Sequence, residues 1–337
     1  MAVSAEVRRN ATLVLVAGAV YFVLQALLTG FALPLGPYER VLFPGLLTED
    51  LWMLRLVVMI LSSLGLVLAF RAWVRPAGKA AWAAAAFVAV SWAPVHYGPQ
   101  ARPEVLLMFA CVAAAGFATR WLVERDRPAL VSTGLALTVA MLLDPVVGIA
   151  LALALTAVVL VWARVQGGPA LVALGTGVVA GRVTAWLLRR VLDTAEALAL
   201  IRVGEIEAGN PWAALTVFEP LAGADDGRGV RIAAGVVAVV GVTVLGMFWQ
   251  RWPHRHNAAR VGTAVAVVLA VAVLMFSATA TPFWLPIWGL VAIAAGAGLL
   301  AAWRTARDTG SALATVGYVV VVVAYIAWQV AEAASAA

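Results

Sequence analysis

Two short groups of charged residues stand next to apolar stretches and carry side chains suited to group-transfer chemistry. The first is Glu49-Asp50, which directly precedes an apolar run that begins at Leu51. A carboxylate at this position can act as a general base that removes the proton of an attacking hydroxyl, or as a cation ligand. The same acids also suit the first turn of a helix, where they interact favourably with the helix dipole. Both interpretations stay open.

The second group is Arg102-Pro103-Glu104, which ends a polar segment that starts at His96 and contains glycine and proline. A guanidinium next to an apolar run can hold a lipid-linked phosphate through two parallel hydrogen bonds. Arg102 is therefore a candidate phosphate ligand. A proline at a helix start and a glutamate in the first turn give a purely structural interpretation of the same motif.

Two further positions combine charge with an apolar setting. Asp144-Pro145 separates two apolar runs with almost no loop, which predicts an N-cap followed by a proline at the first helical position. Arg182, with Arg189 and Arg190, lies toward the end of another apolar run. These arginines either reach lipid phosphates from within the run or bind the phosphate of an anionic substrate.

The residues that usually bind metals and cofactors are few and scattered. His96, His254 and His256 are the only histidines, and the topology below places the last two on the opposite side of the membrane from the first. The single cysteine, Cys111, lies within an apolar run and is expected to be a packing residue. No Walker motif or glycine-rich dinucleotide loop is present, so we predict neither a metal site nor a cofactor.

The composition places these groups in a membrane. The 337 residues are 64% hydrophobic and 12% charged, with a mean hydropathy of +0.99, which a water-soluble domain does not sustain. The formal net charge of +6 would otherwise suggest nucleic acid as a partner. No soluble basic face is available to bind it, so we interpret the arginines as signals of membrane topology.

Apolar runs of about twenty residues predict eleven transmembrane helices in one all-α integral membrane domain over residues 1–337. The shortest expected span, 129–143, rises only about 22 Å at helical pitch, which is short of a hydrocarbon core of roughly 30 Å, and we treat it as a real but short span. The predicted spans are 11–31, 51–70, 80–97, 104–123, 129–143, 145–163, 169–188, 230–249, 260–277, 283–303 and 311–330.

The charge distribution predicts a multi-pass plasma-membrane protein with its N-terminus in the cytoplasm. With eleven alternating spans, fourteen of the 23 basic residues but only four of the 17 acids fall on the cytoplasmic side. The long connections at 32–50 and 189–229 then lie outside, where we expect the functional site.

Several segments, taken in chain order, resemble one known family. They are Leu51-Trp52-Met53-Leu54-Arg55, Ala81-Trp82-Ala83-Ala84-Ala85, Ser91-Trp92-Ala93-Pro94, Arg102-Pro103-Glu104 and Val123-Glu124-Arg125. Looser matches are Asp144 to Gly148, Arg202-Val203 leading to Trp212, and Phe276 to Thr279. In this order and spacing they resemble the membrane core of the cell-wall arabinosyltransferases that ethambutol targets, over roughly residues 50–305.

The resemblance implies a GT-C fold whose outer loops bind a polyprenyl-phosphate sugar and a cell-wall glycan acceptor, and which transfers arabinose without a nucleotide. It implies a single displacement in which Glu49 or Asp50 takes the acceptor proton. Arg102, with Arg182 or Arg202, would bind the donor phosphate. The remaining expected substrate contacts are Glu104, Asp144 and Trp212.

The chain also departs from that family. The acidic pair that the family places after its first core helix has no counterpart between Gly30 and Leu35, and the family's large C-terminal carbohydrate-binding domain is not expected here. Two alternatives to the enzyme therefore remain. One is a non-catalytic relative that binds polyprenyl lipid or serves as a partner subunit of a true transferase in the membrane, and the other is a small transporter.

Overall fold

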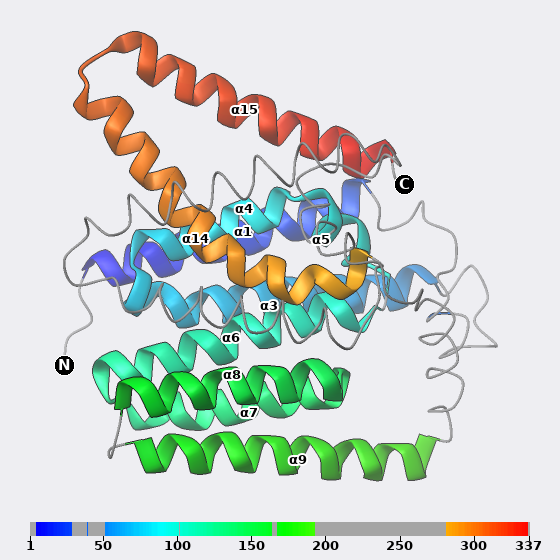
Figure 1. Cartoon of the computed structure of the whole chain (residues 1–337). Helices are drawn as coiled ribbons and strands as arrows, with labels where there is room; N and C mark the ends of the chain where they lie inside the picture. Colours follow the sequence, from blue (N-terminus) through cyan, green and yellow to red (C-terminus); the bar gives the residue numbers. More distant parts are fainter. Residues whose placement is uncertain are drawn as a thin grey trace, which may run out of the picture.

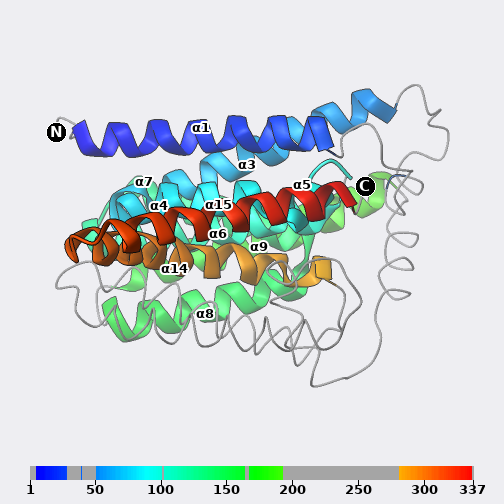
Figure 2. The ribbon, with the colours of Figure 1, turned by 90° about the horizontal axis from the view of Figure 1, so that it is seen from above.

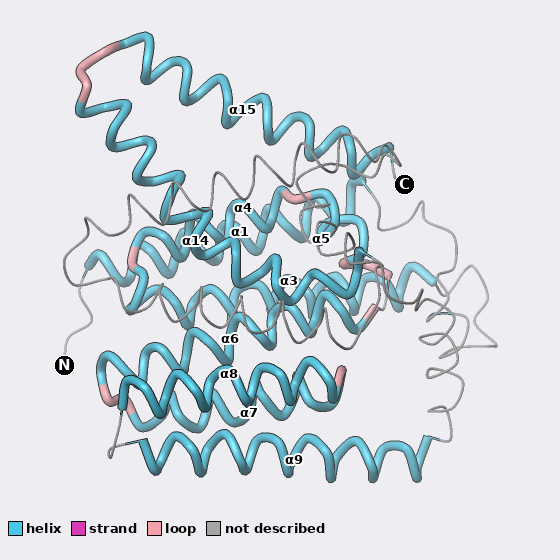
Figure 3. The backbone as a smooth tube through the Cα atoms, viewed as in Figure 1, coloured by secondary structure: helices cyan, strands magenta, loops and turns pink. Residues whose placement is uncertain are grey.

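The protein is described here by a computed structural model that covers residues 5–28, 39, 51–100, 102–163, 167–192 and 281–335. All regular structure in these ranges is α-helical (Figure 3). The helices are α1 (Ala5–Leu28), α3 (Leu51–Ala77), α4 (Lys79–Val90), α5 (Trp92–Tyr97), α6 (Pro103–Glu124), α7 (Arg127–Leu143), α8 (Pro145–Ala163), α9 (Gly168–Leu192), α14 (Thr281–Asp308) and α15 (Ala312–Ser335).

Most of the predicted spans are confirmed as helices. Within the described residues, six helices are long and apolar enough to cross a membrane, and α4, α7 and most of α8 form shorter apolar helices. The predicted span at 129–143 is part of α7, a helix of 17 residues. The predicted spans at 230–249 and 260–277 lie outside the described residues.

The predicted span at 80–97 is wrong as a single helix, because Ser91 adopts an extended conformation and divides it into α4 and α5. The backbone N–H of Trp92 donates to Oε1 of Gln329 on α15 at 2.9 Å instead of continuing the helix. Pro94 has no N–H to offer to the preceding turn. The chain therefore turns here, and α5 runs toward the start of α6 (Figure 3).

The helices run lengthwise past one another, and α6 lies in their middle (Figures 1 and 2). Helix α6 packs against α3, α7 and α14, whereas α1 packs against α3 and α4. Helix α9 forms one edge of the molecule and packs mainly on α7, while α15 forms the opposite edge beyond α14. Apart from the short α5, which continues toward the same end as α4, the successive long helices of the described ranges alternate in direction, so their ends gather at two opposite ends of the bundle.

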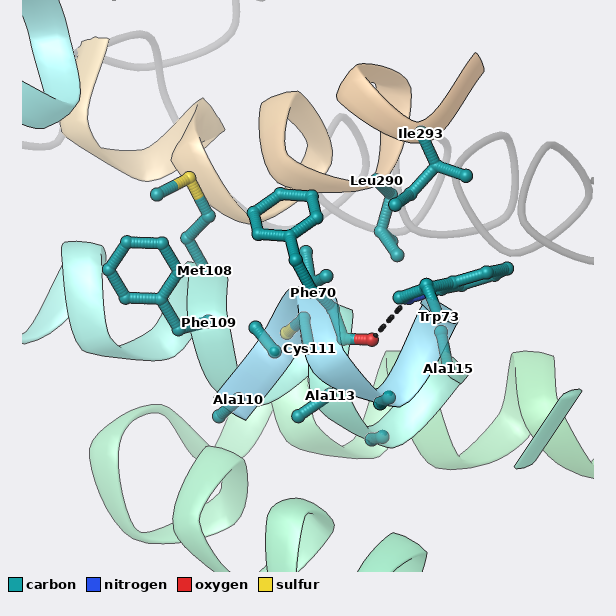
Figure 4. Close-up of a cluster of buried hydrophobic side chains, with 14 of the residues drawn as sticks. Phe70, Trp73, Met108, Phe109, Ala110, Cys111, Ala113, Ala115, Leu290 and Ile293 are labelled. Atoms are coloured by element: carbon teal, nitrogen blue, oxygen red, sulfur yellow. Dashed lines mark hydrogen bonds between the residues drawn. The ribbon is translucent and has the colours of Figure 1, made fainter. Parts of the chain in front are cut away.

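Small residues allow α6 to approach its neighbours closely (Figure 4). A Cβ atom at Gly116 would lie only 2.7 Å from Nε1 of Trp73 on α3. That indole nitrogen donates to the carbonyl of Val112 at 2.9 Å, so the buried tryptophan has a partner for its polar atom. Cys111 is fully buried in the same cluster and has no disulfide, which confirms its expected packing role.

Ion pairs join three helices at the end of the bundle that we call the basic end. This end comprises the start of α1, the α3–α4, α6–α7 and α14–α15 junctions and the start of α9. Arg75 of α3 contacts Glu124 of α6 at 3.1 Å, and Arg120 pairs with Asp126. The chain turns through Arg125, which has φ 56°. Arg75 and Arg120 therefore connect α3, α6 and the α6–α7 junction.

Candidate functional site

The other end of the bundle, which we call the α5–α6 end, holds three of the four predicted site residues that the structure describes, namely Arg102, Glu104 and Asp144. It comprises the end of α1, the start of α3, all of α5, the start of α6 and the α7–α8 junction. The break at Ser91 determines the position of this region. After the break, α5 and the turn that follows it lead to the start of α6.

Arg102 is the residue just before α6, and its described contacts include Gln100 and Tyr97. Its Nε donates to Oε1 of Gln100 at 3.1 Å, and Nε2 of Gln100 donates to the carbonyl of His96 at 3.2 Å. The guanidinium carbon lies 5.0 Å from the centre of the Tyr97 ring. The side chain is partly exposed. The contacts with Gln100 and Tyr97 orient the guanidinium at the end of the bundle.

Glu104 follows Arg102 by two positions and lies in the first turn of α6, with Pro103 at the helix start. This geometry confirms the structural interpretation of the motif. The glutamate side chain is only 3% exposed. The same short motif therefore directs the arginine outward and the carboxylate inward.

His96 and Gly98 line the turn that carries Arg102. The His96 ring lies edge-on to Tyr97, with ring centres 4.9 Å apart, and its Nδ1 is buried without a hydrogen-bond partner among the described residues. A Cβ atom at Gly98 would lie 2.6 Å from Oε1 of Gln25 on α1. Glycine is needed here because of this close approach, which fixes the turn against α1.

Polar groups on α1 and α3 form hydrogen bonds that hold α5 and the turn after it. The Tyr21 hydroxyl donates to the carbonyl of Pro94 at 2.7 Å, and the Ser62 hydroxyl donates to Oε1 of Gln25 at 3.1 Å. All four residues are buried. Hydrogen bonds in such a water-poor interior are costly to break, so they hold the turn firmly.

A fully buried ion pair lies at the start of α3. Nε and Nη2 of Arg55 donate to the two carboxylate oxygens of Glu39, at 3.1 and 3.0 Å, and neither side chain is exposed. From the sequence, Arg55 was noted only as part of a motif, and Glu39 had no predicted role. An arginine within the first turns of an apolar helix was the signal that could have found the pair.

Asp144 has a clear structural role. Its Oδ1 accepts hydrogen bonds from the backbone N–H groups of Val146 at 2.8 Å and Val147 at 3.2 Å. The predicted N-cap with Pro145 at the first helical position of α8 is confirmed. The carboxylate is 4% exposed, and this oxygen is occupied by the helix that it caps.

Arg182 does not join Arg102 in one cluster. It is exposed on α9, and Figure 1 places α6, α7 and α8 between α9 and α5. The placement suits the alternative in which the arginine reaches lipid phosphates. Glu49, Asp50, Arg202 and Trp212 lie outside the described residues.

Within the described ranges, no group of three or more histidine, cysteine, aspartate or glutamate side chains is placed to hold a metal ion. What this end offers is an oriented guanidinium, aromatic rings and buried polar groups. A guanidinium beside aromatic rings is able to hold a phosphate that is attached to an apolar chain.

Comparisons with known proteins bear on the fold. No protein-family model and no curated protein matches the sequence. The oligosaccharyltransferase AglB from Archaeoglobus fulgidus, solved with an inhibitory peptide and a dolichol-phosphate, is similar with a TM-score of 0.52 and 12% identity over 86% of this chain. This chain spans 45% of AglB. ArnT from Cupriavidus metallidurans, bound to undecaprenyl phosphate, gives a TM-score of 0.48 and 15% identity over 95% of this chain and 69% of ArnT.

At this level of identity the likeness to AglB shows the fold alone. The expected all-helical, GT-C-like membrane architecture is confirmed. The substrate, the reaction and the partners of this chain are matters for proposal.

Proposed function

We propose that this chain is a GT-C-like membrane glycosyltransferase relative that binds a polyprenyl-phosphate sugar at its α5–α6 end. The observation that carries the proposal is the partly exposed Arg102, held by Gln100 and Tyr97 where α5 meets α6. The solved structure of AglB, which shares the fold, contains a dolichol-phosphate. The arabinosyltransferase-like motifs supply the proposed sugar, arabinose, and the proposed acceptor, a cell-wall glycan.

The proposed reaction is a single displacement at the anomeric carbon. The acceptor hydroxyl oxygen bonds to that carbon as the bond to the phosphate oxygen breaks, and the polyprenyl phosphate leaves. The acceptor proton passes to a carboxylate. Arg102 supports the leaving group because its guanidinium can donate to two phosphate oxygens at once.

The carboxylates that the structure describes at the α5–α6 end are poorly placed to act as the general base. Glu39 is held by both hydrogen bonds of Arg55, and Asp144 caps α8. Glu104 is buried in the first turn of α6. We keep Glu49 and Asp50 as the proposed base, because this acidic pair directly precedes α3.

Binding of a polyprenyl phosphate to the purified chain in lipid nanodiscs tests the role of Arg102. Removal of a charge-assisted hydrogen bond should weaken binding about ten- to a hundred-fold in Arg102→Ala. Arg182→Ala is the matched control, since Arg182 is exposed on α9, and it should bind as the parent does. Equal affinity in the parent and Arg102→Ala would remove the arginine from the proposed site.

Transfer from a labelled polyprenyl-phosphate arabinose tests the reaction itself. If the parent transfers sugar, the double variant Glu49→Gln, Asp50→Asn should lose about 10²- to 10⁴-fold in rate while still binding the donor. Unchanged transfer in this variant would exclude the pair as the base.

A second candidate function is a non-catalytic relative that binds polyprenyl lipid or partners a true transferase. Burial of Glu39, Glu104 and Asp144 favours it, because these carboxylates at the α5–α6 end are not exposed to an acceptor. Lipid binding that depends on Arg102, together with no transfer to any cell-wall acceptor by the parent, would support this candidate over the enzyme.

The proposed orientation places the basic end in the cytoplasm and the α5–α6 end outside. Ala334 and Thr309 are exposed at opposite ends of α15, and the native Cys111 is buried. A cysteine at Ala334 should react with an impermeant reagent in intact cells, whereas one at Thr309 should react only after permeabilisation. The reverse pattern would invert the orientation and move the proposed site to the cytoplasm.

A further inference from the structure

A cavity of about 820 Å³ opens at the basic end, away from the proposed transfer site. Its walls come from the start of α1, the start of α4, the last turns of α14 and the second turn of α15. In Figure 1 the end of α14 and the start of α15 project away from α1 and α4 toward their connection, and residues from all four helices line the cavity. The volume falls within the range of about 300–1,000 Å³ that is usual for small-molecule sites.

The lining of the cavity is strongly positive. Its charged residues are Arg9, Lys79, Arg304, Arg307 and a single acid, Asp308. The ion-pair network of Arg75 and Arg120 at the same end is different, because two acids face two arginines there. The excess of cations in the cavity suits an anionic ligand.

A buried amide is the second feature that points to a ligand. Asn10 on α1 lines the cavity and is 1% exposed, yet neither Oδ1 nor Nδ2 has a hydrogen-bond partner among the described residues. A buried amide without partners is unfavourable, and native proteins rarely keep one. A ligand that carries both an acceptor, such as a phosphate oxygen, and a hydroxyl donor would satisfy both atoms.

The third feature is apolar. Trp82, Trp303 and Tyr318 line the cavity. The rings of Trp303 and Tyr318 lie 5.5 Å apart, and the Tyr318 hydroxyl already donates to the carbonyl of Leu299 at 2.9 Å. The aromatic wall therefore offers mainly apolar surface. Tryptophan and tyrosine of this kind are enriched at the depth of lipid headgroups.

We infer that this cavity binds the phosphorylated headgroup of an anionic phospholipid. Arg9, Lys79 and Arg307 contact the phosphate, Asn10 pairs with a headgroup hydroxyl and a phosphate oxygen, and the aromatic wall covers the glycerol region. Basic cavities between membrane helices on the cytoplasmic side are a known type of lipid-headgroup site. A bound lipid would also connect α14 and α15 to α1 and α4.

The test is titration of phosphatidylglycerol into the delipidated chain in a neutral detergent, followed by native mass spectrometry. Lys79→Gln with Arg307→Gln should weaken binding roughly thirty-fold, at about five-fold for each cation. The matched control is Arg71→Gln with Arg127→Gln, which removes two exposed arginines at the same end that do not line the cavity. It should bind nearly as tightly as the parent. Equal losses in the two variants would overturn the proposal in favour of general surface attraction.

Two further measurements distinguish a specifically bound lipid from a soluble anion. Asn10→Leu should raise the unfolding temperature of the lipid-free chain. It should also reduce the further rise in unfolding temperature that phosphatidylglycerol produces. If that rise is the same in Asn10→Leu as in the parent, the proposed role of the amide is wrong. Inorganic phosphate or glycerol phosphate that stabilises the chain as strongly as the lipid would identify a soluble ligand instead. Arg102→Ala should leave phosphatidylglycerol binding unchanged, so this inference and the proposed function can fail separately.

Discussion

The two ends of the helix bundle handle charge in different ways. At the basic end, Arg75 and Glu124 form a pair whose side chains are 40% and 32% exposed. At the α5–α6 end, Arg55 and Glu39 form a bidentate pair with no exposure at all. Water screens the exposed pair but not the buried pair. Removal of one partner should therefore change the free energy of unfolding far more at the buried pair than at the exposed pair.

The largest expected effect comes from breaking the buried pair. Arg55→Ala leaves the Glu39 carboxylate buried without its partner, which should cost about 3–5 kcal/mol of the free energy of unfolding. Denaturant unfolding of the purified chain in detergent measures this. Reversal of the pair, Glu39→Arg with Arg55→Glu, should recover part of the loss. A cost below about 1 kcal/mol for Arg55→Ala would place this pair in water and remove the contrast between the ends.

The packing between the two ends is expected to be nearly as sensitive. Gly116→Ala brings a Cβ atom against Trp73 on α3 and should cost about 1–3 kcal/mol through overpacking. Gly175→Ala is the matched control, because a Cβ there meets nothing within 4 Å, and it should be neutral or stabilising by up to about 1 kcal/mol. Equal thermal stabilities for the two variants would mean that α3 and α6 approach less closely than described.

A local effect is expected where α15 meets the break between α4 and α5. Gln329→Leu removes the acceptor of the Trp92 N–H. This should lower the free energy of separating α15 from the break between α4 and α5 by about 1–3 kcal/mol. Hydrogen exchange should speed up at the Trp92 amide and along α15, with little change in α6 and α7. If hydrogen exchange becomes faster to the same extent in all described helices, α15 does not open on its own.

The smallest effect is expected at the basic end. Arg75→Ala should cost no more than about 1 kcal/mol, and the cost should shrink further in 1 M salt, where the screening length is about 3 Å. Unfolding in low and high salt measures both. A salt-independent loss above about 2 kcal/mol would show that this network carries as much of the fold as the buried pair does.

Local chemistry accounts for the features that the sequence predicted. Pro103 and Pro145 begin helices because proline at the first helical position loses no hydrogen bond, and Asp144 caps α8 through its own next residues. Cys111 packs as its apolar run indicated. The two helix starts and the cap depend only on residues a few positions away, and burial of Cys111 follows from the apolar run around it.

The missed features depend on distant parts of the chain. The break at Ser91 requires Gln329, more than two hundred residues later, to accept the Trp92 N–H. The ion pair between Glu39 and Arg55 requires contacts between separate elements. The same holds for the cavity at the basic end. Apolar periodicity along one run carries no information on such contacts, which is why Arg55 and Asn10 were not singled out.

Photo-crosslinking with a polyprenyl phosphate that carries a diazirine beside the phosphate tests the central proposal most directly. The peptide that contains Trp92 to Glu104 should be labelled in the parent and in Arg182→Ala, and should lose the label in Arg102→Ala. Label that persists at the α5–α6 end in Arg102→Ala, or that falls only on α9 or on the basic end, would contradict the proposed site.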